Sequence, residues 1–82
     1  MKIKYFAWIK DITNVDEEEI INEDIKDIND LKNFISKKYP KLSIHMQNNE
    51  IIRVAINLEY INENQKIFVN DEIAFFPPVS GG

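Results

Sequence analysis

A single stretch of this chain, residues 28–39, carries a sustained helical pattern, and it limits the folds that the chain can adopt. Its apolar residues recur at helical spacing and are Ile28, Leu31, Phe34, Ile35 and Tyr39. Asp27 is a suitable N-cap, because its carboxylate can accept hydrogen bonds from the free backbone N–H groups of the first turn. Pro40 disfavours helical angles at Tyr39 and so ends the helix. One helix cannot bury its apolar side alone, so the rest of the chain must supply a second layer.

Residues 2–10 (KIKYFAWIK) alternate in a way that predicts a first strand. The face predicted to meet the core carries Ile3, Tyr5, Ala7 and Ile9. The opposite face carries Lys2, Lys4, Phe6, Trp8 and Lys10. Two large aromatic side chains among lysines are unexpected on a face that meets only water. For Trp8 two roles are open, packing under a loop or anchoring a partner.

Three further strands are predicted, in residues 17–22, 51–57 and 72–76. The turn before the first of them contains Asn14, which tolerates a left-handed backbone, so the first two strands are expected to form a hairpin. The four acidic residues 16–19 are interpreted as a solvated turn that leads into an edge strand, and residues 41–50 as an irregular polar connection. Alternation in the last strand predicts an inward pair, Ile73 and Phe75, and an outward pair, Ala74 and Phe76.

These elements predict an α+β fold, in which a mixed sheet of about four or five strands packs on one main helix. This is the β-grasp or ubiquitin-like layout. With 82 residues the chain has the length of one compact domain, expected to span residues 1–76, followed by an extended tail in residues 77–82. A domain of this size has little room for a deep pocket, so any chemistry is expected at a surface or at a terminus.

The tail differs in composition from the rest of the chain. The last ten residues, IAFFPPVSGG, contain no charged side chain, and Pro77-Pro78 favours an extended exit from the sheet. Gly81 and Gly82 are the only two glycines of the chain. Without Cβ atoms they can pass through a channel too narrow for other residues. A terminal glycyl carboxylate that is coupled to AMP becomes a mixed anhydride, which a sulfur or amine nucleophile can attack. The alternative is a loose tail that ends in glycine by chance.

The stretch 69–82, VNDEIAFFPPVSGG, is similar to the C-terminal signature of molybdopterin synthase small subunits. The first strand, the helix that contains Leu31 and the Val54–Asn57 strand follow in the order and at the intervals of that family. The resemblance therefore spans essentially the whole chain. The tail motif is its specific part, whereas the rest is ordinary β-grasp patterning.

The resemblance implies a sulfur carrier of molybdenum cofactor biosynthesis, not an enzyme on its own. An E1-like adenylating enzyme, which uses ATP and magnesium, would activate Gly82, and a sulfur relay would convert the adenylate to a thiocarboxylate. The tail would then enter the active site of the large synthase subunit and donate sulfur to cyclic pyranopterin monophosphate. The working assembly of the family is a heterotetramer of two small and two large subunits. No cofactor would be bound stably by the carrier.

The resemblance also assigns candidate site residues. Gly82 matches the activated residue and Gly81 its slender neighbour in the tail. The positions that match partner contacts of the family are Phe6, Tyr60, Phe76, Pro77, Pro78, Val79 and Ser80. The alternation of the strands independently places Phe6 and Phe76 on the outer sheet face. Tyr60 stands where the family usually has an aliphatic residue.

Composition argues against several other classes of protein. The net charge of -4 disfavours a nucleic-acid partner, which needs clustered lysine and arginine. The absence of cysteine excludes disulfides and cysteine metal sites, and His45 has no second ligand at useful spacing, so no metal site is predicted. No apolar run approaches the roughly 20 residues of a membrane span, and no leader pattern opens the chain. We therefore expect a cytoplasmic protein.

Three other functions are open at this stage. A sulfur carrier for thiamine thiazole synthesis would share the fold and the tail chemistry, but such chains usually lack the Phe-Phe-Pro-Pro sequence that precedes the tail here. A ubiquitin-like modifier would join Gly82 to lysines of target proteins through the same adenylate. A plain β-grasp binding module would keep its function without Gly81 and Gly82.

Overall fold

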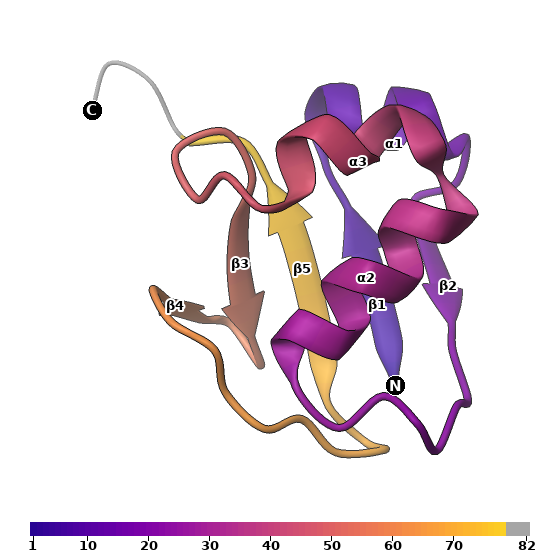
Figure 1. The fold of residues 1–82 in the computed structure, drawn as a ribbon, viewed down its shortest axis with the longest axis vertical. Coiled ribbons are helices and arrows are strands. Elements are labelled where there is room, and N and C mark those ends of the chain that lie inside the picture. Colours follow the sequence, from indigo (N-terminus) through magenta and orange to yellow (C-terminus); the bar gives the residue numbers. More distant parts are fainter. Residues whose placement is uncertain (79–82) are drawn as a thin grey trace.

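The computed structural model describes residues 1–78 and consists of a five-stranded sheet and three helices. The strands are β1 (Lys2–Tyr5), β2 (Glu17–Glu19), β3 (Arg53–Ile56), β4 (Glu59–Ile61) and β5 (Glu72–Phe76). The helices are α1 (Ala7–Thr13), α2 (Ile28–Lys38) and α3 (Pro40–Met46). Figure 1 shows α2, the longest helix, lying across one face of the sheet.

The sheet is mixed, as the sequence predicts. Its strand order is β2-β1-β5-β3-β4, and the central strands β1 and β5 run parallel while the other neighbours run antiparallel. The parallel register pairs Ile3 with Ile73 and Tyr5 with Phe75. This order, with one long helix crossing over the sheet, confirms the predicted β-grasp fold.

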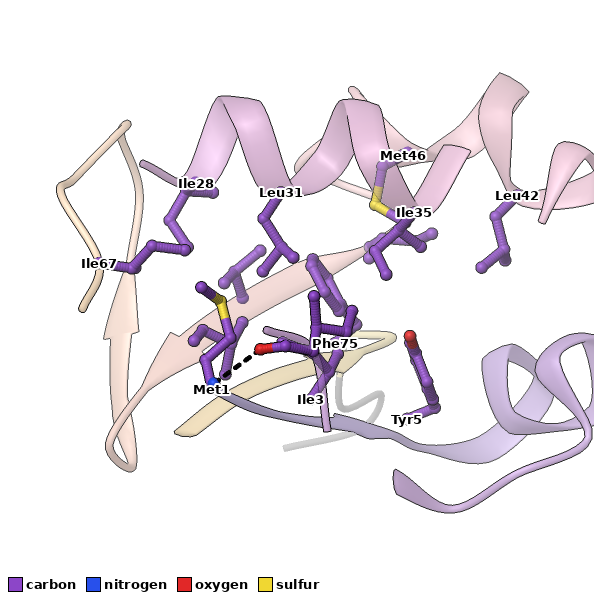
Figure 2. Close-up of a cluster of buried hydrophobic side chains, with 14 of the residues drawn as sticks. Met1, Ile3, Tyr5, Ile28, Leu31, Ile35, Leu42, Met46, Ile67 and Phe75 are labelled. Carbon is purple, nitrogen blue, oxygen red and sulfur yellow. Dashed lines mark hydrogen bonds between the residues drawn. The ribbon is translucent and has the colours of Figure 1, made fainter. Parts of the chain in front are cut away.

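The core lies between the two central strands and α2 (Figure 2). Ile3 and Phe75 from the strands and Leu31 and Ile35 from the helix are each 0% exposed. Burial of large apolar side chains of this kind contributes roughly 1.5–3 kcal/mol per residue. The predicted inward pair of the last strand is confirmed, because Ile73 is also fully buried.

Helix α2 begins at the predicted cap. The Asp27 backbone is extended, and its Oδ1 accepts a hydrogen bond from the Asp30 backbone N–H at 2.8 Å. This hydrogen bond is the leading reason that the pKa of the Asp27 carboxyl lies below its usual range. The other Asp27 carboxylate oxygen accepts a hydrogen bond from the Asn64 side chain at 3.3 Å. The cap therefore also ties the segment between β4 and β5 to the start of the helix.

The prediction of a strand over residues 2–10 is wrong in its second half. β1 ends at Tyr5, and α1 follows from an extended Phe6 N-cap to a left-handed Asn14 C-cap. The alternating pattern is ambiguous because the position of Ile9 also fits a helix. In α1, Ile9 and Thr13 lie four residues apart on the same side of the helix, and both are buried. Ala7, which was expected in the core, is exposed.

The expectation of an irregular connection over residues 41–50 is also wrong, because most of it is α3. Pro40 ends α2 and at the same time occupies the first position of α3, where a missing N–H costs nothing. Leu42 and Met46, four residues apart, are both 0% exposed. The short helix thus adds two side chains to the core.

The acidic segment 16–19 is not a wholly solvated turn. Glu17–Glu19 is the edge strand β2, antiparallel to β1. Glu18 is half-buried, and its Oε2 accepts hydrogen bonds from the hydroxyls of Tyr5 and Tyr39 at 2.7 and 2.6 Å. Glu18, the middle residue of β2, therefore joins β2 to β1 and to the end of α2.

Candidate functional site

The sheet face opposite α2 carries a shallow apolar hollow of about 580 Å³. Its floor is formed by Ala55 and Ala74, which are paired neighbours on β3 and β5. We call the whole lining the apolar outer face, and its residues are Phe6, Ala55, Leu58, Tyr60, Ala74, Phe76, Pro77 and Pro78. The hollow exists because two small side chains in the middle of the sheet are surrounded by large ones.

The large side chains of the apolar outer face remain open to solvent in this chain. Phe6 is 47% exposed, Tyr60 73% and Leu58 87%. The rings of Tyr60 and Phe76 contact each other, with their centroids 5.3 Å apart and their planes tilted by 33°. Clustered exposed aromatic side chains of this kind are typical of surfaces that bind another protein.

Charged side chains border the apolar outer face. Lys4 and Glu72 form an ion pair at 3.6 Å, and Lys10 and Asp16 form another at 2.6 Å beyond Phe6. The hydrogen bond to Asp16 is the main reason that the pKa of Lys10 lies above its usual value. An apolar centre with a polar rim is the usual anatomy of a protein–protein interface.

Arg53 lies on β3, which is separated from Lys4 on β1 by β5, and it is beside Tyr60, Phe76 and Pro78. Within the described part of the chain, no carboxylate approaches its guanidinium within 4.0 Å. Arginine is enriched at interface positions that contribute most to binding, because its planar donors can pair with a carboxylate in two hydrogen bonds. Arg53 is therefore available to a carboxylate on a partner.

The structure brings together five of the residues that the sequence proposes for the site. Phe6, which directly follows β1, Tyr60 of β4 and Phe76 of β5 all line the hollow, together with Pro77 and Pro78. The other four, Val79, Ser80, Gly81 and Gly82, lie outside the described residues. The roles of all nine in binding or chemistry stay predictions.

Sequence reasoning missed Leu58, the most exposed large side chain of the apolar outer face. Asn57 and Leu58 form the two-residue turn between β3 and β4, with φ angles of 50° and 71°. Two positive φ angles are typical of the type I′ hairpin turn, which favours asparagine and glycine. A leucine in this place is strained, and the only mark of the turn in the sequence is Asn57, a residue that tolerates a left-handed backbone.

Replacing Leu58 by glycine is expected to raise the free energy of unfolding by about 1 kcal/mol, because a left-handed backbone costs a residue with a Cβ roughly that much. Urea denaturation measures the change. The matched control is Asn57→Gly, which removes hydrogen bonds to the Glu72 backbone N–H at 2.9 Å and to Asp71 Oδ1 at 3.0 Å. The control is expected to lower stability, and an equal gain in both variants would contradict strain at Leu58.

Trp8, for which the sequence leaves two roles open, is half-buried against the core cluster. Its ring packs edge-on against His45 of α3, with the ring centroids 5.5 Å apart. It does not line the apolar outer face. This position favours the packing role, in which Trp8 joins α1 to α3.

Two kinds of feature are absent from residues 1–78. No group of three histidine, cysteine or acidic side chains in this range is placed to hold a metal ion. In the same range no helix has the length and the apolar character needed to cross a membrane.

Comparison with known proteins relates the whole chain to one family. The family model described as ThiS family matches residues 3–82. A molybdopterin synthase sulfur carrier subunit of Dictyostelium discoideum is 38% identical over 86 residues, which cover 99% of this chain and 94% of the relative. A protein of the same name from Escherichia coli (strain K12) is 23% identical over 82 residues, which cover 100% of this chain and 99% of the relative. The solution structure of small archaeal modifier protein 1 from Methanosarcina acetivorans superposes with a TM-score of 0.78 at 24% identity, covering 99% of this chain and 94% of that one.

Proposed function

Because the chain belongs to the ThiS family, we propose that it is the sulfur-carrier subunit of a molybdopterin synthase. The observation that carries the proposal is the match over nearly the whole length of both chains to a 38% identical sulfur carrier subunit of that synthase. The features of this chain that support the proposal are a β-grasp domain, an apolar outer face and a tail that ends in Gly81-Gly82. The carrier acts in the cytoplasm and is not an enzyme on its own.

The chemistry is proposed to take place at Gly82. An E1-like enzyme binds ATP and magnesium, and the Gly82 carboxylate attacks the α-phosphorus, so that pyrophosphate leaves and an acyl-adenylate forms. A sulfur donor then replaces AMP, which leaves a thiocarboxylate on Gly82. This group donates its sulfur to cyclic pyranopterin monophosphate in the active site of the large subunit, and two such transfers complete the dithiolene. The carrier itself holds no stable cofactor.

The apolar outer face is the proposed binding surface for the large subunit. Pro77 and Pro78 belong both to this face and to the start of the tail, so a partner that covers the face also receives the tail. Proline fixes φ near −65° and so limits the directions that the tail can take. Binding and sulfur delivery are thereby combined, and Val79, Ser80 and Gly81 are the residues that connect Pro78 to the reacting Gly82 in the sequence. The proposed assembly is a heterotetramer of two carriers and two large subunits.

The proposal is tested by reconstitution with purified components. The chain is made with a C-terminal thiocarboxylate and mixed with a molybdopterin synthase large subunit and cyclic pyranopterin monophosphate, and molybdopterin is assayed. We expect product that depends on the thiocarboxylate and is lost when Gly82 is deleted. The matched control extends the tail by one alanine, which keeps both glycines but moves the terminal carboxylate.

A large subunit that is active with its own carrier but makes no product with this chain would contradict the pathway assignment. The same thiocarboxylate is then supplied to a thiazole-forming system, to test a role in thiamine synthesis. Isopeptide-linked conjugates of Gly82 in cell extract would instead indicate a ubiquitin-like modifier. A chain that keeps its partner binding and its cellular function without Gly81 and Gly82 would be a plain binding module.

A further inference from the structure

The helix side of the sheet carries a second and chemically different cleft, of about 210 Å³. It is lined by residues of α2 and of the segments that follow α3 and β4. Figure 1 shows both segments on the β4 side of the sheet. Its polar lining includes Asn29, Lys32, Asn49, Asn62 and Glu63. Pockets for drug-sized ligands measure about 300–1,000 Å³, so this cleft has the size of a small ion or group.

Lys32 is the feature that distinguishes the cleft. Its side chain is 6% exposed, and it is the only charged residue among residues 1–78 that is buried. Its ammonium donates a hydrogen bond to Asn49 Oδ1 at 3.0 Å, and no carboxylate of the described chain lies within 4.0 Å of it. Burial lowers the pKa of Lys32, as expected for a cation without a counter-charge. A buried ammonium in this state is costly unless an anion joins it.

The amide groups around Lys32 supply further donors. A lysine ammonium can only donate, so the Asn49 amide must turn its oxygen toward Lys32 and its NH2 group away from it. Within residues 1–78 that NH2 group has no hydrogen-bond partner in the protein, and neither has the Asn62 side chain. One cation and two neutral amides thus border the same small space. This set of donors suits an oxyanion with several acceptor atoms.

We propose that this cleft binds a small tetrahedral oxyanion, either inorganic phosphate or the terminal phosphate of a small monoester, with Lys32 as its counter-charge. The anion accepts hydrogen bonds from the Lys32 ammonium and from the side-chain amides of Asn49 and Asn62. It supplies the negative charge that the buried lysine lacks within the described chain. Binding therefore also stabilises the fold, because the anion binds the native state only.

The oxyanion site and the apolar outer face lie on opposite sides of the sheet. Val54 lines the cleft, whereas the next residue, Ala55, lines the apolar outer face. Successive side chains of a strand point to opposite faces, so the two sites are separated by the thickness of β3. A carrier bound to its large subunit through the outer face can therefore still hold the anion.

Glu63 is the one acidic side chain of the cleft lining. It is exposed and forms no ion pair with any residue of the described chain. A carboxylate at the rim repels a phosphate, so Glu63→Gln is expected to strengthen phosphate binding. The same variant tests the competing explanation, in which Glu63 itself is the counter-charge of Lys32 in solution. That explanation requires Glu63→Gln to lower the stability of the phosphate-free protein.

The experiment is a titration of the full chain with inorganic phosphate, followed through backbone amide NMR shifts at constant ionic strength. We expect saturable shifts that centre on Lys32, Asn49 and Asn62, and a melting temperature that rises with phosphate. Glycerol phosphate in a second titration distinguishes a monoester from the free ion as the preferred source. Sodium chloride at matched ionic strength provides the control for nonspecific screening.

The decisive variant is Lys32→Gln, which removes the charge but can keep a hydrogen bond to Asn49. It is expected to fold and to weaken phosphate binding about tenfold or more, because a hydrogen bond to a charged group is lost. Lys26→Gln removes the same charge from an exposed position outside the cleft and is expected to bind as the unaltered chain does. Phosphate binding that survives in Lys32→Gln, or chloride shifts equal to those of phosphate, would overturn the proposal.

Discussion

Replacing Phe6 by aspartate is expected to weaken binding to the large subunit at least about 100-fold, since aromatic anchors of an interface contribute roughly 2–4 kcal/mol each. The substitution removes one aromatic wall of the apolar outer face and places a carboxylate in it. On binding, that carboxylate would lose its water without gaining a partner, which adds to the loss. Calorimetric titration of the variant with a molybdopterin synthase large subunit measures the dissociation constant.

The position of Phe6 separates this effect from any loss of stability. Phe6 is the N-cap of α1, with an extended backbone at φ −124° and ψ 152°, and its side chain makes no capping hydrogen bond. Aspartate is among the best N-cap residues, because its carboxylate accepts hydrogen bonds from the first turn. Phe6→Asp is therefore expected to keep or raise the melting temperature of the free chain while it abolishes tight binding.

A matched control introduces the same charge elsewhere. Ile21 is 82% exposed, follows β2 at the end of the sheet where Met1 lies, and does not line the apolar outer face. Ile21→Asp is expected to bind the large subunit as the unaltered chain does. Equal weakening by both variants would mean that net charge, rather than the outer face, governs the interaction. Unchanged binding of Phe6→Asp would remove this face from the proposed interface.

The parts of the fold that the sequence predicts well are those with a local and unambiguous pattern. Helix α2 has its cap at Asp27 and its end before Pro40, and both come from side-chain chemistry within a few residues. The last strand is predicted over residues 72–76, the bounds that β5 has, because the alternation of inward Ile73 and Phe75 with outward neighbours is not interrupted. Such segments need no knowledge of the rest of the chain.

Helix α1 was missed because the turn that starts it carries no sequence signal. The chain changes direction at Ala7, which has a positive φ of 54°, whereas such angles are normally marked by glycine or asparagine. An alanine there gives no reason to end the strand at Tyr5. Helix α3 was missed for a related reason, since Pro40 was interpreted only as the end of one helix and not as the start of the next. In both cases tertiary packing decides between patterns that the sequence allows.

The candidate site likewise contains residues that the sequence places correctly and residues that it does not place. Phe76 was assigned to the outer face from alternation alone, and Phe6 kept that orientation although its strand ends one residue earlier. Leu58 and Arg53 could not be assigned, because their place in the site depends on how β3 and β4 lie beside β5. A surface that is assembled from several strands follows from the sheet order, and no single segment encodes that order.

Glu18 provides the second large expected effect, on stability rather than on binding. Its carboxylate accepts hydrogen bonds from the Tyr5 and Tyr39 hydroxyls and from the Lys38 ammonium. Burial, the largest single influence, raises the pKa of Glu18, but the hydrogen bonds from Lys38, Tyr39 and Tyr5 together outweigh it and hold the pKa below its ordinary value of 4.5. Tyr39 is affected in turn, since its burial and its hydrogen bond to Glu18 raise the pKa of the Tyr39 hydroxyl to about 12.

Replacing Glu18 by alanine is expected to lower the free energy of unfolding by about 3 kcal/mol, because it leaves the buried Tyr5 hydroxyl without an acceptor and also removes the bonds from Tyr39 and Lys38. For a domain of this length a loss of that size lowers the melting temperature by roughly 10–25 °C. Glu18→Gln keeps one acceptor oxygen and the shape of the side chain, so its loss is expected to be smaller. Glu17→Ala, at an exposed position on the same strand, is expected to change stability little and controls for strand propensity.

The pH dependence separates the charge of Glu18 from its shape. A carboxyl whose pKa is lower in the folded than in the unfolded chain stabilises the fold fully above the unfolded value of 4.5, and this contribution is lost as the pH falls through the lower, folded value. The stability difference between the unaltered chain and Glu18→Gln should therefore be constant at neutral pH and shrink below about pH 4.5. Urea denaturation at several pH values measures it. A difference that stays constant down to acid unfolding would show that the ionised form of Glu18 contributes nothing beyond its shape.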